Sequence, residues 1–227
     1  MVSQYQWQML IDLGLLSGTA VDYNLYIGAL LLVIVAMLSI VLLQQLLDSQ
    51  VFGDIRRISV IMLITVLNVG LCVLLCRFAN LYVAPVAMGS MLLTSLLGWR
   101  CGVPAGVGLS LLGAGIAAAG SNLGNSEATQ LLLMNLAGAL VSASFLSVGT
   151  QRMRVVLCGL LVAVSDAACS MAVGLMTSCD MQSLIGNMVW YVAGAILSGV
   201  LALGLQPVFE SVFNLATPSK LQELSNP

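Results

Sequence analysis

The chain has 227 residues, of which 60% are hydrophobic and 7% are charged, and its formal net charge is -2. Because about a quarter of the residues in a soluble domain are charged, this composition excludes a water-soluble globule and predicts an integral membrane protein. The seven basic residues leave no footprint for nucleic acid, and the absence of histidine excludes histidine-based metal sites and general bases.

Glycine is plentiful (22 residues) whereas aromatic residues make up only 6% of the chain, which favours closely packed helices over a β-barrel with aromatic girdles. We therefore expect an all-α fold, a polytopic bundle of membrane helices. A spanning helix needs about 20 apolar residues. Seven windows approach this length: 25–46, 58–76, 79–98, 101–120, 129–148, 154–176 and 186–209.

The residues ahead of the first window, 1–22, are polar and amphipathic, and so do not resemble a cleavable signal peptide. Within them, Ser3 and Gln6 have capping-box spacing and Gly14 would stop a short helix over residues 3–16.

The third and fourth windows are separated only by the residues from Gly98 to Cys101, which predicts a tight hairpin of antiparallel neighbours. Pro85 and Pro104 lie near the starts of these windows, so we expect them to cause limited disruption.

Small residues at helical spacing predict close helix contacts in two windows. Gly102 and Gly106 form a GxxxG pair in the fourth window, and Ala195 and Gly199 repeat the small-xxx-small pattern in the seventh. We expect these residues to pack inside one bundle; the alternative is dimerisation or a close-fitting ligand.

Three polar side chains are expected at membrane depth. Asp166 lies well inside the sixth window, where an acid costs about 2.5–3.5 kcal/mol on insertion scales, so it must face the bundle interior or water. It could bind a cation, carry a proton or meet a ligand's positive group, or it could be a protonated or hydrogen-bonded structural clamp. Asn68 and Asn135 could complete a polar site with it, or serve only as interhelical hydrogen-bonding groups.

The end of the last window combines a helical pair with a proline. Gln206 and Glu210 share a helix face at i, i+4 spacing, and Pro207 between them would bend or loosen the last turns. This pattern predicts a hinge through which a signal could leave the membrane, or else an interfacial acid beside a proline without such a role. Thr217 followed by Pro218 then predicts the start of a short helix ending before Pro227.

The basic residues predict the orientation, because short cytoplasmic loops are enriched in Lys and Arg. With seven crossings and the N-terminus outside, only Arg77 lies on the outer side. The six others lie inside: Arg56, Arg57, Arg100, Arg152, Arg154 and Lys220. We therefore expect a cytosolic C-terminus.

Nothing in the sequence predicts catalysis or a resident cofactor. The six cysteines lack the further ligands that a metal site needs, and neither a glycine-rich phosphate loop nor a nucleophile elbow is present. We expect no catalytic residue, no cofactor and no metal centre in this chain.

Both ends of the chain carry a family resemblance. Near the N-terminus, the residues that resemble the last stretch of the extracellular domain of the seven-transmembrane HD hydrolase family are Val2, Ser3, Gln6, Leu10, Leu13, Gly14, Leu15 and Leu16. Near the C-terminus, the residues that resemble that family's junction with its HD domain are Pro207, Phe209, Glu210, Phe213, Thr217, Lys220, Leu221, Glu223, Leu224, Ser225, Asn226 and Pro227. The hairpin segment from Ala84 to Ala87, with Leu92 and Leu93, is similar as well.

The resemblance implies a bacterial inner-membrane receptor in which an extracellular domain is joined by seven spans to a cytosolic phosphodiesterase of cyclic di-AMP. The family's HD metal ligands are His and Asp residues, so no catalytic residue is carried over to a chain without histidine. We expect the membrane module alone: 1–22 as the end of the extracellular domain, 23–213 as the seven-helix domain, and 214–227 as a cytosolic strut towards an HD domain.

Three functions are compatible with these patterns. The favoured one is a sensory module, not itself an enzyme, that couples an outer or intramembrane signal or small-molecule ligand to the phosphodiesterase; its partners would be the lipid bilayer, its own two soluble domains and, in one reading, a second copy. The alternative is a small-molecule binding or transport bundle resembling vitamin-uptake components, although no inverted repeat is evident. A scaffold subunit of cell-envelope assembly is the third.

Overall fold

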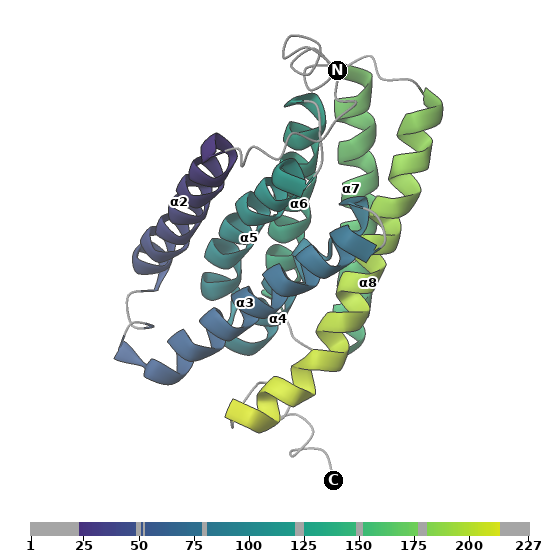
Figure 1. The fold of residues 1–227 in the computed structure, drawn as a ribbon. Helices are drawn as coiled ribbons and strands as arrows, with labels where there is room; N and C mark the ends of the chain where they lie inside the picture. Colours follow the sequence, from purple (N-terminus) through teal and green to yellow (C-terminus); the bar gives the residue numbers. More distant parts are fainter. Residues whose placement is uncertain are drawn as a thin grey trace.

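The computed structural model describes residues 23–48, 51, 53–78, 81–120, 125–148, 152–176 and 181–213. Within these ranges the chain is helical, and its elements in order are α2 (Tyr23–Leu47), α3 (Ile55–Phe78), the 3-10 turn η2 (Leu81–Val83), α4 (Val86–Leu97), α5 (Trp99–Gly120), α6 (Asn125–Leu146), α7 (Arg152–Met176) and α8 (Met181–Phe213). Figure 1 shows them gathered into one bundle, with α2 at one edge and α7 and α8 at the other. The short helix expected over 3–16 and the strut expected over 214–227 lie outside the described residues.

Among the described residues, six helices are long and apolar enough to cross a membrane: α2, α3, α5, α6, α7 and α8. The prediction of an all-α, multi-pass membrane bundle is therefore confirmed. Each of these helices overlaps one of the predicted windows and extends it by a few residues at one or both ends.

The third predicted span, 79–98, is wrong as a single membrane-crossing helix. Its helical part is α4, which has only 12 residues, preceded by the 3-10 turn η2. The physical reason is Pro85, the N-cap residue of α4, because a proline disfavours helical geometry in the residue before it and so separates η2 from α4. Pro104 causes less disruption, since it lies inside α5 and the helix continues to Gly120.

The predicted hairpin forms, but its turn is tighter than four residues. Gly98 alone separates α4 from α5; its φ of 96° lies in the left-handed region that glycine enters without strain. Its N–H donates to the carbonyl of Thr94 at 3.1 Å, while its carbonyl accepts from Cys101 and Gly102, each at 3.1 Å. Trp99, Arg100 and Cys101 therefore belong to α5.

Helix α4 forms the centre of the bundle. All residues from Val86 to Leu96 are buried, and α4 packs against α3, α5, α6 and α8. Its hydroxyl groups bond within the helix, as when Thr94 donates to the carbonyl of Ser90 at 2.6 Å, so they bring no unsatisfied donor into the core. By contrast, α2 packs chiefly on α5 and leaves large apolar side chains such as Leu30 and Leu46 exposed, as expected where a helix faces lipid.

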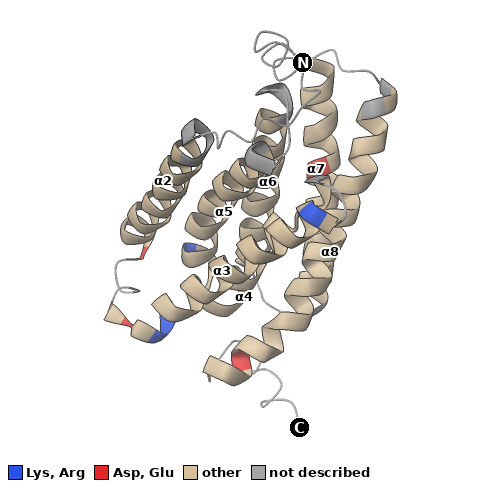
Figure 2. Cartoon of the chain, in the orientation of Figure 1, with Lys and Arg blue, Asp and Glu red and all other residues tan. Residues whose placement is uncertain are grey.

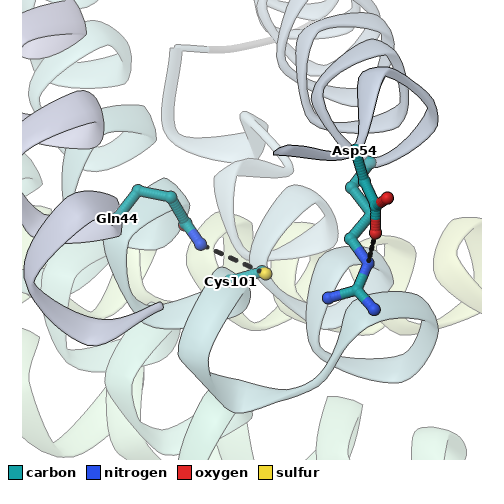
Figure 3. Close-up of polar contacts among 4 residues, drawn as sticks. Gln44, Asp54 and Cys101 are labelled. Carbon is teal, nitrogen blue, oxygen red and sulfur yellow. Dashed lines mark hydrogen bonds and ion pairs between the residues drawn. The ribbon is translucent and has the colours of Figure 1, made fainter. Parts of the chain in front are cut away.

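Buried polar contacts connect neighbouring helices. The amide of Gln44 on α2 donates to the sulfur of Cys101 on α5 at 3.3 Å (Figure 3), and Gln130 on α6 donates to Ser170 on α7 at 3.2 Å. The hydroxyls of Ser90 on α4 and Ser142 on α6 lie 2.7 Å apart. In a bilayer each such contact contributes about 0.6–2 kcal/mol. No single contact therefore determines how the helices pack, and their sum matters more.

The charged residues are few and lie mostly at one end of the bundle (Figure 2). Asp54 and Arg57 form an ion pair of 3.2 Å beside the start of α3 (Figure 3), and both side chains are substantially exposed. Because α5 and α7 also begin at this end, Arg100 and Arg154 belong to it, whereas Arg77 is in the last turn of α3 at the other end.

Candidate polar site inside the membrane bundle

A small cavity lies between α6, α7, α8 and the segment that leads into α4. Its volume is about 20 Å³, and its lining residues include Tyr82, Ala87, Asn135, Asp166, Tyr191 and Ser198. Two of the three predicted polar residues, Asn135 and Asp166, are thus brought together at one cavity.

Asp166 carries the only carboxyl group among the residues that line the cavity. Its Oδ1 atom is buried and has no hydrogen-bond partner among the described residues. A Cβ built on Gly138 of α6 would lie 3.0 Å from this oxygen and 3.1 Å from Cγ1 of Val162. The carboxyl group therefore lies close to the α6 backbone, and a side chain at position 138 would force it to shift.

Hydroxyl, amide and aromatic groups surround the rest of the cavity. The rings of Tyr82, from η2, and Tyr191, from α8, contact each other with centroids 5.1 Å apart. Ser198 of α8 donates its hydroxyl to the carbonyl of Gly194 at 2.8 Å, which leaves its oxygen lone pairs available on the other side. Four separate parts of the chain therefore meet at one polar point inside an otherwise apolar bundle.

One wall of the cavity is formed by Ala84, just before α4, and Ala87 in its first turn. The amides of its first turn are partly used locally: Val86 donates to the carbonyl of Ala84 at 2.9 Å, and Met88 donates to that of Pro85 at 3.2 Å. The break in the helix at Pro85 thus contributes a wall of the cavity, but its backbone N–H groups do not bond to Oδ1 of Asp166.

The third predicted polar residue, Asn68, is not among the residues that line the cavity. It is 1% exposed, and its amide donates to the carbonyl of Pro85 at 3.0 Å while its oxygen accepts from Cys72 at 3.7 Å. Asn68 therefore holds the segment that leads into α4 against α3.

The two small-residue motifs lie inside the bundle. A Cβ on Gly102 would approach Ser90 and Thr94 of α4, and one on Gly106 would lie 2.8 Å from Cβ of Ala139 on α6. Gly199 packs against Gly159 of α7, a partner that the sequence did not single out. Ala195, one turn earlier on α8, also lines the cavity, so this contact and the polar site are adjacent.

The predicted hinge residues are part of the continuous helix α8. The amide of Gln206 donates to Oε1 of Glu210 at 3.0 Å, so the i, i+4 pair is in contact. Pro207 lies inside the helix and supplies no N–H to the carbonyl of Leu203. Beyond it, Phe209 is buried and stacks on Phe213 with ring centroids 6.2 Å apart.

Sequence reasoning missed several residues of this site. Gly138 could have been found from its spacing, since it lies one turn after Asn135 on the same helix face. Tyr82, Tyr191 and Ser198 could not, because only the packing of η2 and α8 brings them to Asp166. No group of three or more His, Cys, Asp or Glu side chains that could hold a metal occurs within the described ranges.

These features define a class: a multi-pass helical membrane protein with a short central helix and a polar cavity beside it. A family model described as the 7TM receptor with intracellular HD hydrolase matches residues 23–217, and the chain belongs to that family. It corresponds to the membrane module, and no HD domain is matched in it. No curated protein and no solved structure matches the chain.

Proposed function

We propose that this chain is the transmission module of a receptor, which conveys an outer or intramembrane signal to a cytosolic HD phosphodiesterase that hydrolyses cyclic di-AMP. The observation that carries the proposal is α8, a single helix of 33 residues. At 1.5 Å per residue it is about 50 Å long, which exceeds the roughly 30 Å of a bilayer's hydrocarbon core. A change of packing inside the bundle would therefore be carried beyond the membrane by the same helix.

The contacts of α8 support a signal route through it. Its middle meets the polar cavity through Tyr191, Ala195 and Ser198, and it then contacts α7 at Gly199. Further along, Gln206, Pro207 and Glu210 precede the end of the family match at residue 217. The cavity-lining residues and the Pro207 turn thus belong to one continuous helix, which two alternative packings of α7 and α8 would reposition.

The location and orientation follow from the same proposal. A bacterial inner membrane, an outer N-terminus and a cytosolic C-terminus agree with the excess of basic residues at the end where α8 finishes. The transport alternative gains no support from the cavity, since about 20 Å³ is far below the roughly 300 Å³ or more of a small-molecule pocket.

The test compares variants of a receptor in which this module is joined to its HD domain, in native membranes. Pro207→Ala restores the backbone donor inside α8 and is expected to change the basal rate of cyclic di-AMP hydrolysis at least about twofold, equivalent to ~0.4 kcal/mol. Gly204→Ala, whose added Cβ would meet nothing within 4 Å, is the matched control and should leave the rate unchanged. Equal rates for Pro207→Ala and the parent, at equal expression, would remove the support for transmission through this turn.

The reading frame beyond Pro227 provides an independent check. Genomic DNA that continues in frame into a segment with an adjacent His-Asp pair is the expected result. A stop codon directly after Pro227 would argue against the proposal and would favour a free-standing bundle.

A further inference from the structure

We propose that the cavity at Asp166 binds one dehydrated monovalent cation of about the size of Na⁺. Size is the first argument. A volume of about 20 Å³ holds a single water-sized particle and excludes an organic amine or a metabolite.

Charge is the second argument. Asp166 has no ion-pair partner within the described part of the chain, and its Oδ1 is buried without a hydrogen-bond donor. An isolated carboxylate in this setting is costly, so a counter-charge inside the cavity would stabilise it. One carboxylate balances one positive charge, whereas a divalent ion would leave a surplus charge in the membrane interior.

The chemistry of the lining groups is the third argument. Asp166, Asn135 and Ser198 line the cavity from three different helices, and each of these side chains contains an oxygen that can ligate a cation. The proton of the Ser198 hydroxyl is engaged by the carbonyl of Gly194, so its oxygen faces other partners as an acceptor. Oxygen ligands of this kind suit hard cations, whereas softer transition metals favour nitrogen and sulfur.

Gly138 has a specific role in this proposal. Its missing side chain leaves the space in which Oδ1 of Asp166 lies, since a Cβ there would be 3.0 Å from that oxygen. Gly138→Ala therefore crowds the site while keeping the carboxylate. Binding itself does not depend on the proposed function; only its consequence for α8, through Ser198 beside Gly199, rests on it.

The test measures the thermal unfolding midpoint of the purified 227-residue chain in detergent while NaCl replaces choline chloride at constant ionic strength. Binding to the folded state alone should give a saturable rise of roughly 5 °C at about 100 times the dissociation constant. Asp166→Asn should abolish the rise, and Gly138→Ala should reduce it by more than half. For each variant the measured quantity is the change of the unfolding midpoint with Na⁺ concentration. A variant that is less stable at every Na⁺ concentration is therefore not mistaken for one that has lost the site.

Two controls separate the site from general ion effects. Asp54→Asn removes an exposed acid at the start of α3, and Gly186→Ala adds a Cβ that would meet nothing within 4 Å. Both should keep the full Na⁺ response. A midpoint of the parent chain that does not depend on Na⁺ would overturn the proposal and leave a protonated Asp166. The same shift in Asp166→Asn as in the parent would overturn it too. If Asp166→Asn does not fold, the response of Gly138→Ala relative to Gly186→Ala decides.

Discussion

Gly159 of α7 and Gly199 of α8 meet backbone to backbone. A Cβ built on Gly199 would lie 3.1 Å from Cα of Gly159, and one built on Gly159 would lie 3.2 Å from Cα of Gly199. A rotamer change cannot relieve these contacts because the obstacle is main chain. Ser198, which lines the polar cavity, precedes Gly199 directly, so any separation of α7 and α8 here also changes the geometry around Asp166.

The first prediction follows from this contact. Gly199→Ala should lower the free energy of unfolding by about 1–3 kcal/mol, because the two helices must move apart to accommodate one methyl group. Thermal unfolding of the purified chain in detergent measures the effect. Gly204→Ala, on the same helix with open space around its Cβ, should leave the midpoint within experimental error. A midpoint for Gly199→Ala as high as that of Gly204→Ala would mean that the contact is looser in solution.

The second prediction concerns the hydroxyl pair at the bundle centre. Ser90 and Ser142 lie 2.7 Å apart, yet each hydroxyl also reaches a carbonyl of its own helix, so two protons serve three acceptors. Ser142→Ala should therefore cost only about 0.6 kcal/mol, at the low end for interhelical hydrogen bonds. Ser147→Ala is the control, since that exposed hydroxyl, just after α6, donates only to the carbonyl of Ser144 and its loss should cost less. Comparable losses for the two variants would show that the α4–α6 contact contributes nothing beyond the local bond.

The third prediction tests what holds the segment before α4. Asn68→Leu keeps a similar volume but removes the donor to the carbonyl of Pro85, leaving that oxygen only the amide of Met88 at 3.2 Å. The loss of a buried donor should cost about 1–3 kcal/mol in thermal unfolding. Val66→Ala on the same helix, where the side chain is 63% exposed, is expected to cost about 0.5 kcal/mol or less. A smaller loss for Asn68→Leu than for Val66→Ala would contradict the assigned role of Asn68.

The fourth prediction concerns orientation. A green fluorescent protein fused after Phe213 should be fluorescent and alkaline phosphatase at the same position inactive, because the excess of basic residues predicts that this end lies in the cytosol. Fusions after Met176, where α7 finishes at the opposite end, should give the reverse pattern. The opposite pattern at both fusion sites would show that the orientation is the reverse of the predicted one.

Hydropathy predicted most of the fold because membrane helices satisfy their backbone hydrogen bonds within one segment, so their existence depends on local sequence. It failed at 79–98, where the apolar run continues through Pro85 but the backbone cannot. Hydropathy treats that run as one continuous lipid-facing helix, whereas it is divided at Pro85 and the residues of α4 are buried against four neighbouring helices.

The polar site was only partly predictable. The cost of an acid at membrane depth identifies Asp166, and the same argument identifies Asn135. Asn68 is also a polar residue at membrane depth, but it does not join the cavity. Its position on α3 faces the start of α4, where it donates to the carbonyl of Pro85. Gly159 and Ala163 have small-xxx-small spacing on α7, but the sequence does not say which helix they meet; the contact with Gly199 of α8 appears only in the packed structure.

The burial of α4 from Val86 to Leu96 has a consequence for how the protein is made. Twelve residues reach only about 18 Å, which is too short to cross a bilayer's hydrocarbon core unaided. When α4 leaves the ribosome, α5, α6 and α8, which will enclose it, have not yet been synthesised. The segment therefore cannot reach its final packing until the later helices have entered the membrane. Its first neighbour is α5, which follows it directly after the Gly98 turn.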